Sequence, residues 1–276
     1  MPILDLKSSN GYLHFDRDQC VAEGTSRAAA YQSATPFPHI VMDDFVDAGV
    51  LRGLVDEFPA REGRAFFDRA QERFKYQFDP NTVESARVRN LLSELNGEPF
   101  LAFLSAMTGI EGLISDPYFA GGGLHETLAG GHLSVHADFN LHHIMNIERR
   151  LNLLIYLNDD WSPDYGGSLE LWDVKMRGAA VSVLPVMARA VVFNTTLKSF
   201  HGQPDPLACP PDRSRRSIAT YYYTALPAEV SVPNRTTTFQ TRPGSTDRTD
   251  WKVRTAHLIE DWVPPRLQKY ARRVLR

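Results

Sequence analysis

Apolar residues recur at helical spacing in three segments of the first half of the chain. The segment 47–58 repeats apolar positions every three or four residues, with Asp47 as an N-cap and Pro59 as a terminator. A second helix is expected over 82–95, and a third over 99–109, where Gly109 suits a C-terminal cap. We expect these helices to brace one face of a sheet.

Other parts of the first half give weaker patterns. Residues 1–35 show little periodicity apart from a short edge strand at 11–15, and 39–42 is expected to form another strand. The segment 61–80 mixes charged and aromatic residues and fits neither period. We interpret it as a loop with partly buried aromatic side chains, with a mobile lid over a binding site as the alternative.

From residue 116 the pattern changes to short strands separated by turn residues. The strands are expected at 151–157, 168–172, 180–184, 190–194 and 217–224. Many short strands without intervening helices favour a β-sandwich or jelly roll.

We therefore expect a mainly β protein with flanking helices (α+β), organised as one integrated domain. Residues 1–114 would be an N-terminal extension with supporting helices, 115–226 the jelly-roll core, and 227–276 a partly helical C-terminal extension. Within that extension we expect an added strand at 234–239, a helix at 250–262 and a basic, solvated terminal helix at 266–276.

Composition narrows the range of partners and compartments. The 276 residues, 43% of them hydrophobic, suffice for one substantial core. A formal net charge of −3 gives no overall attraction to nucleic acid or to an anionic membrane surface. The start of the chain lacks the pattern of a secretion signal, so a cytoplasmic location is expected. Cys20 and Cys209 are interpreted as ordinary thiols, and a homodimer remains open.

Candidate chemistry begins in the stretch 131–140. If residues 133–139 form a strand, alternation places Ser134, His136 and Asp138 on one face and the apolar residues on the other. Two metal-binding side chains would then share a face.

A second histidine and an arginine follow in a suggestive order. Two imidazoles and one carboxylate, here His136, Asp138 and His201, are the donor set of non-heme Fe(II) oxygenases and leave metal positions open. Arg216 lies beyond His201, and a guanidinium binds a carboxylate through two parallel hydrogen bonds.

Five ordered motifs resemble the 2-oxoglutarate- and Fe(II)-dependent dioxygenases of the prolyl 4-hydroxylase type. The resemblance covers roughly residues 115–226. The motifs are His136-Ala137-Asp138, Tyr156 to Trp161, Gly166 to Trp172, His201, and Arg216 to Tyr222. HxD alone is a weak signal, whereas five motifs in order are specific.

The resemblance implies a double-stranded β-helix, a jelly roll of the cupin kind, with His136, Asp138 and His201 as Fe(II) ligands. It also implies that Arg216, assisted by Tyr156, binds the distal carboxylate of 2-oxoglutarate. Dioxygen would be the oxidant, succinate and carbon dioxide the coproducts, and ascorbate an auxiliary reductant. The retained carboxylate of Asp138 favours hydroxylation over halogenation, with desaturation or cyclisation still open.

Several neighbours compete for these roles. His125, His132, His142 and His143 are rival metal ligands, and Arg213 and Arg215 flank Arg216. Strand alternation allows only one of Arg215 and Arg216 to reach a cavity. Where several relatives carry a tyrosine before the HxD motif, this chain has His125-Glu126-Thr127, which leaves one cosubstrate contact unassigned.

Candidate substrate contacts rest on position near the strand ends alone. They are Asn140, Asn152, Trp172, Asn194 and Thr196.

Three functions are compatible with this pattern. The leading one is hydroxylation of a small molecule, such as an amino acid or a biosynthetic intermediate. The second is hydroxylation of a prolyl residue in a protein or peptide, which needs an open groove. The third is a catalytically silent jelly roll that binds a ligand, although a binding module has no need of all four site residues.

Overall fold

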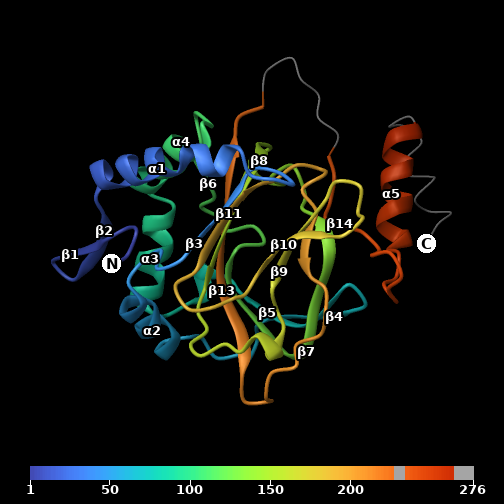
Figure 1. Cartoon of the computed structure of the whole chain (residues 1–276), viewed down its shortest axis with the longest axis horizontal. Coiled ribbons are helices and arrows are strands. Elements are labelled where there is room, and N and C mark those ends of the chain that lie inside the picture. The colour runs from blue at the N-terminus through green and yellow to red at the C-terminus, as the bar shows by residue number, and fades with distance from the viewer. Residues whose placement is uncertain (227–233, 264–276) are drawn as a thin grey trace.

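A large, mostly antiparallel sheet curls into a nearly closed, jelly-roll-like barrel in the computed structural model (Figure 1), which describes residues 1–226 and 234–263. The main path of the sheet runs β10-β9-β12-β7-β13-β8-β11-β3. This confirms the expected fold class. These strands span Ala179–Val183 (β10), Leu169–Trp172 (β9), His201–Gln203 (β12), Gly123–Ala137 (β7), Ser214–Thr224 (β13), Glu148–Tyr156 (β8), Ala190–Asn194 (β11) and His39–Met42 (β3). The small strand β6 (Ile114–Ser115) pairs with β13, and β1 (Leu6–Ser9) pairs with β2 (Tyr12–Phe15) in a separate hairpin.

The five strands expected between 151 and 224 all form, with small shifts at their ends. The short strand that begins at His201 was not predicted. It is too short to show an alternation of apolar and polar residues, and its conformation depends on pairing with β7 and β9.

Four helices cover one side of the barrel, at the left of Figure 1. They are α1 (Arg17–Gln32), α2 (Ala48–Asp56), α3 (Ala86–Leu95) and α4 (Glu98–Thr108). Helices α2, α3 and α4 correspond to the three expected from periodicity. Asp47 and Ser85 cap α2 and α3 by accepting hydrogen bonds from the Val50 and Val88 amides.

Helix α1 was not predicted, because residues 1–35 show little hydrophobic periodicity. Its buried face consists of Cys20, Gly24 and Tyr31, so it shows little hydrophobic period. A Cβ at Gly24 would lie 2.4 Å from the carbonyl oxygen of Phe103, which shows how closely α1 and α4 approach. Small residues allow that contact, and they do not register as an apolar stripe.

The interpretation of 61–80 as a loop is wrong for most of its length. Residues Ala65–Arg69 (β4) and Glu72–Phe78 (β5) form a hairpin, and β5 adds to the edge of β7. The aromatic residues lie on both sides of the hairpin, and its pairing with β7, distant in sequence, holds it on the barrel.

The C-terminal region lies on the side of the barrel opposite α1 to α4 (Figure 1). The expected strand at 234–239 is reduced to β14 (Thr238–Phe239), which pairs with the end of β7. The expected helix forms as α5 (Trp251–Trp262). The predicted helix at 266–276 lies outside the described residues. Among the described helices, none combines the length and apolarity needed to cross a bilayer.

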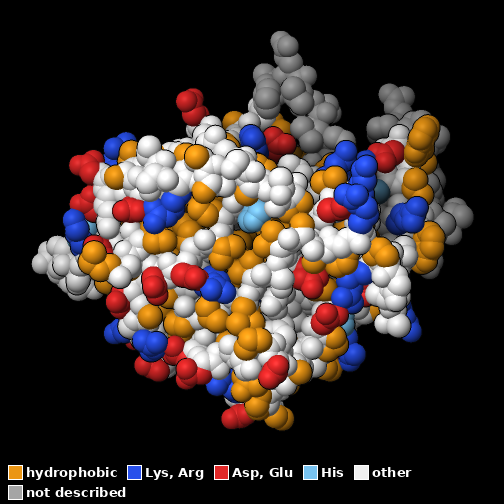
Figure 2. Space-filling model, viewed as in Figure 1, with side chains coloured by type: hydrophobic (Ala, Val, Ile, Leu, Met, Phe, Trp, Pro, Cys, Tyr) orange, Lys and Arg blue, Asp and Glu red, His pale blue; other side chains and the backbone are white. Residues whose placement is uncertain are grey.

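Acidic and basic side chains are interspersed over the face shown in Figure 2. This distribution agrees with the small net charge of the chain.

An aromatic cluster joins the helices to the barrel. The Phe100 ring lies 5.6 Å from that of Phe15, 6.1 Å from Phe45, 5.5 Å from Phe103 and 6.0 Å from Tyr222. Phe100 therefore links α4 to β13 through fully buried contacts.

We predict that Phe100→Ala lowers the free energy of unfolding by about 3–5 kcal/mol, because it leaves a cavity at this junction. Urea denaturation of the variant measures the change. Tyr12→Ala, which removes a ring that is 70% exposed, is the control and should cost far less. Equal losses in the two variants would show that Phe100 does not anchor the helical layer.

Candidate active site

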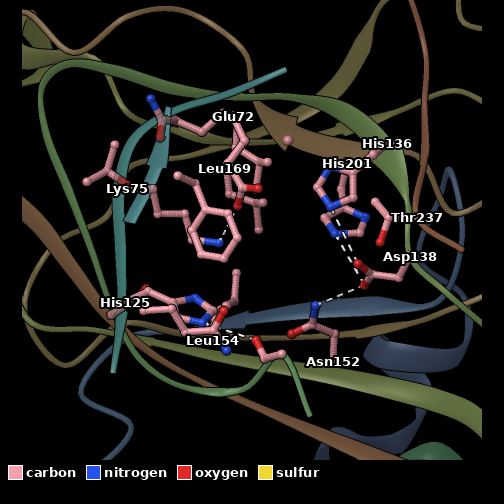
Figure 3. A pocket seen from close by; sticks show the side chains of 18 of the residues that line it. Glu72, Lys75, His125, His136, Asp138, Asn152, Leu154, Leu169, His201 and Thr237 are labelled. Carbon is pink, nitrogen blue, oxygen red and sulfur yellow. Dashed lines mark hydrogen bonds and ion pairs between the residues drawn. The ribbon is translucent and has the colours of Figure 1, made fainter. Parts of the chain in front are cut away.

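The side chains of His136, Asp138 and His201 point toward one another (Figure 3). His136 and His201 pair across β7 and β12, and Asp138 follows the end of β7. The Asp138 carboxylate lies 3.4 Å from His136 Nε2 and 3.5 Å from His201 Nε2. One donor atom from each residue falls within 4.8 Å of the others, which is close enough to share one ion.

Backbone carbonyls orient the two imidazoles. His136 Nδ1 lies 2.9 Å from the Ser134 oxygen, and His201 Nδ1 lies 3.0 Å from the Ser199 oxygen. A carbonyl oxygen only accepts hydrogen bonds, so each Nδ1 carries the proton. Both Nε2 lone pairs are left facing Asp138, which is the arrangement of metal-binding histidines.

Burial and neighbouring charges keep Asp138 ionised and His201 neutral. Burial by itself raises the pKa of Asp138, but Arg149 and the two histidines outweigh it and hold that pKa far below its usual range. Arg149 Nη2 lies 3.2 Å from Asp138 Oδ2, and Asn152 Nδ2 donates to the same oxygen at 3.4 Å. Burial lowers the pKa of His201 to about 4. An ionised carboxylate beside two imidazoles whose Nε2 atoms face it is a donor set that suits a divalent transition metal.

A cavity of about 210 Å³ opens beside these three residues. Two rows of paired strand residues form the wall away from them. In one row, Lys75 of β5 pairs with Thr127 of β7, which pairs with Arg215 of β13. In the other row, Gln77, His125 and Ser217 pair across the same three strands. All six side chains line the cavity.

The choice of Arg216 as the basic residue of the cavity is corrected by the structure. Arg215 is buried and lines the cavity, where its Nε donates to the Gly167 oxygen at 2.8 Å and its Nη2 to the Tyr156 hydroxyl at 3.3 Å. Arg216 points to the other face of β13 and packs over the Phe58 ring. As strand alternation requires, Arg215 and Arg216 point to opposite faces of β13. Both faces are buried, so the sequence alone did not show which face lines the cavity.

Arg216 belongs instead to a cluster around buried Glu126. The Glu126 carboxylate accepts hydrogen bonds from Arg61 at 2.8 and 3.0 Å, from Ser214 at 2.6 Å and from Arg216 at 3.0 Å. Burial raises the pKa of Glu126, but these partners outweigh it, so the net pKa is below the ordinary value. The cluster is structural and faces away from the cavity.

Tyr156 lies behind Arg215 and does not line the cavity directly. Its hydroxyl accepts the Arg215 hydrogen bond, and burial raises its pKa, so the phenol is neutral. Tyr156 thus positions Arg215. Arg213 lies outside the cavity, where it donates to the Asp159 carbonyl.

Only one of the five predicted substrate contacts lines the cavity, namely Asn152. The others have partners elsewhere: Asn140 accepts from the Arg235 amide, Trp172 donates to Glu170, Asn194 accepts from Tyr31, and Thr196 bonds Ser199. These side chains serve turns and strand contacts, as residues at strand ends often do.

The rival histidines lie apart from the three donors. His125 lines the cavity wall away from the three donors. Burial, and to a smaller extent the positive charge of Lys75, holds the pKa of His125 well below its ordinary value. His132 contacts the Ala70 oxygen, and His142, stacked against the His143 ring, pairs with buried Asp116 at 3.1 Å.

The expected alternation of residues 133–139 fails at one point. His136 pairs with His201 but Leu133 pairs with Gln203, so β7 carries one extra residue between them. This bulge turns Leu133, rather than Ser134, toward the cavity.

Most of the cavity wall was not anticipated from the sequence. Arg149 alone offered a signal, as a basic residue entering an apolar strand. The unanticipated lining residues include Phe67, Arg69, Glu72, Lys75, Gln77, Phe139, Arg149, Gln203, Tyr221, Thr237 and Phe239.

Residues 122–223 match the family model of the 2OG-Fe(II) oxygenase superfamily. This is the family that the motifs of the sequence resemble, and the matched residues include all of them from His136 to Tyr222. The match agrees with the enzyme class expected from the motifs and with the expected use of Fe(II) and 2-oxoglutarate.

Three similar proteins extend the comparison. Mouse prolyl 3-hydroxylase OGFOD1 is 26% identical over 68% of this chain, and the chain spans 33% of its length. A prolyl hydroxylase from Trichoplax adhaerens, solved with a hypoxia inducible factor peptide, has a TM-score of 0.52 at 15% identity, covering 75% of this chain and 91% of that one. SnoN, an epimerase of nogalamycin biosynthesis, has a TM-score of 0.51 at 14% identity, covering 80% and 97%. The two structures establish likeness of fold.

We predict that Glu126→Gln lowers the free energy of unfolding of this oxygenase by about 1–3 kcal/mol at neutral pH, since it removes a buried carboxylate from three charge-assisted partners. The folded-state pKa of Glu126 lies below the unfolded value of about 4.3. The stabilisation is therefore complete above that value and is lost as the pH falls through the folded-state pKa.

Denaturation of both proteins between neutral and strongly acidic pH tests this, with exposed Glu111→Gln as the control. The difference in free energy of unfolding between wild type and Glu126→Gln should become smaller as the solution is acidified. A difference that stays constant with pH would contradict the stabilising role given to the ionised Glu126 carboxylate.

Proposed function

We propose that this oxygenase hydroxylates a small molecule, using Fe(II) held by His136, Asp138 and His201. The observation that carries the proposal is the convergence of both Nε2 atoms and the Asp138 carboxylate on one point at the cavity wall. Three protein donors leave metal positions open for cosubstrate and dioxygen. When bound, Fe(II), 2-oxoglutarate and dioxygen supply the oxidation, with succinate and carbon dioxide as coproducts.

Arg215 is the residue we assign to the distal carboxylate of 2-oxoglutarate. It is the buried guanidinium of the wall away from the triad, with Ser217 beside it on the same face of β13. Burial lowers its pKa, and a bound carboxylate would offset this cost through paired hydrogen bonds. Tyr156 and the Gly167 carbonyl hold the guanidinium in place beforehand.

The remaining residues hold the donors and exclude water. Arg149 and Asn152 hold the Asp138 oxygen that faces away from His136. The rings of Phe67, Phe139 and Phe239 contribute apolar wall. A dry, pre-organised site strengthens the interactions of charged groups within it.

Cavity size favours a small molecule. The space of about 210 Å³ lies below the usual range of about 300–1,000 Å³ for ligand sites. The β4–β5 hairpin and β14 both contribute residues to its wall. After 2-oxoglutarate binds, the remaining room suits one small molecule or a single side chain.

A prolyl residue of a protein is the second candidate, favoured by the similarity to a prolyl 3-hydroxylase. A polypeptide would have to lie outside and insert one ring. Stimulation of succinate formation by free amino acids, compared with proline-containing peptides, separates the two functions.

We predict iron-dependent succinate formation from 2-oxoglutarate by the purified protein in air, and its loss in Asp138→Ala. Removal of the carboxylate eliminates one donor and leaves Arg149 with an unpaired buried charge. Succinate is quantified with and without Fe(II), alone and with added amino acids. Unchanged turnover in Asp138→Ala would exclude the metal assignment, and a protein that binds neither iron nor 2-oxoglutarate would support the silent jelly roll.

We predict that Arg215→Gln raises the 2-oxoglutarate concentration for half-maximal turnover at least about tenfold, because it removes a charge-assisted contact. Arg216→Gln is the matched control, since its side chain lies on the opposite face of β13. Titration of both variants with 2-oxoglutarate checks the assignment. A larger effect from Arg216→Gln would return the role to that residue.

A further inference from the structure

An ionic cluster on the β4–β5 hairpin lines the cavity and has no part in the proposed iron or 2-oxoglutarate sites. Glu72, only 6% exposed, accepts hydrogen bonds from Lys75 Nζ at 2.9 Å and from Arg69 Nη2 at 2.8 Å. All three residues belong to the cavity wall (Figure 3 labels Glu72 and Lys75). The hairpin lies outside the residues matched by the family model.

An irregularity in strand pairing brings Glu72 and Lys75 to the same face. Two residues three positions apart on a regular strand point to opposite faces. Here Arg73 pairs with His132 and Lys75 with Thr127, so residues 128–131 lie opposite Phe74 alone. Phe74 adopts a φ of 50°, which is rare outside glycine and concentrated at functional sites. This distortion turns the Lys75 ammonium into the cavity beside Glu72.

When the charged residues of the cavity wall are paired, one positive charge remains unmatched in the cluster of Arg69, Glu72 and Lys75. Arg149 is matched by Asp138, and Arg215 is assigned to the cosubstrate. Arg69 and Lys75 share the single carboxylate of Glu72. Burial raises the pKa of Glu72, but Lys75 and Arg69 outweigh it, so the acid is ionised.

The Lys75 ammonium also has hydrogen-bonding capacity for a ligand. An ammonium has three N–H donors, and among the described residues the structure gives Lys75 Nζ one hydrogen bond, to Glu72. Its side chain is 12% exposed, so a ligand meets it inside the cavity rather than in bulk solvent. A buried ammonium binds an anion more strongly than an exposed one.

We propose that Lys75, held by Glu72 and Arg69, binds a carboxylate of the prime substrate. This inference rests on the proposed function and specifies its substrate class as a small carboxylic acid, of which free amino acids are examples. A single surplus charge matches a carboxylate. A phosphate dianion would leave an uncompensated negative charge in an enclosed site.

The test uses the iron-loaded protein, with the twenty L-amino acids and their carboxamides as probes. Each compound is added to the succinate assay. Binding to the nickel-substituted, 2-oxoglutarate-loaded protein is then measured by calorimetry. We expect at least one acid to stimulate turnover and to bind, and its carboxamide to do neither.

Lys75→Gln should raise the half-saturating concentration of that acid at least about tenfold, and Lys75→Arg should largely restore it. The 2-oxoglutarate requirement should stay within about twofold of wild type in Lys75→Gln. Arg73→Gln is the matched control, because this residue of the same strand is 45% exposed and pairs with Asp68. It should change neither constant.

Three outcomes overturn the proposal: no acid bound more tightly than its carboxamide, equal binding of the acid by wild type and Lys75→Gln, or a rise in the 2-oxoglutarate requirement of Lys75→Gln equal to that of Arg215→Gln. Failure of the proposed function is separate. It would appear as absence of both succinate formation and 2-oxoglutarate binding in the wild type.

Discussion

The site depends on one buried negative charge, the carboxylate of Asp138. A lone carboxylate in a largely enclosed wall would become protonated, since burial disfavours its charged form. Arg149 and the two imidazoles reverse that preference and hold the pKa of Asp138 far below its usual range. Arg149 is itself fixed against the Tyr221 ring at 3.5 Å. The barrel thus keeps a metal-binding carboxylate ionised before any metal arrives.

Strand β7 organises the rest of the cavity because it meets different partners along its length. It pairs with β13 and β5 near its start and with β12 and β14 near its end. Thr127, which pairs with Arg215, lies in the first half of β7, whereas His136, which pairs with His201, lies near its end, so one strand connects the two sides of the cavity. The irregular stretches of β7 determine which of its residues face the cavity. Because β5 pairs with β7, the same irregularities also set the register of the β4–β5 hairpin.

Several features followed from local patterns alone. Helices α2 to α4 carry strong apolar periods with recognisable caps, and the strands of residues 151–224 are apolar segments between turns. Helix α1 and the hairpin escaped detection for different reasons. The buried face of α1 contains small residues, and the mixed charged and aromatic residues of the hairpin form strands because β5 pairs with β7, which is distant in sequence.

The sequence by itself determined the donor types, their order and the sheet-rich core, because residue chemistry and short-range periodicity are properties of the chain. Only the tertiary structure decided between Arg215 and Arg216, turned Leu133 inward in place of Ser134, and placed Lys75 and Glu72 beside the cavity. Alternation says that neighbours face opposite ways. When both faces are buried it does not say which is inside, and one extra residue in a paired strand reverses the answer.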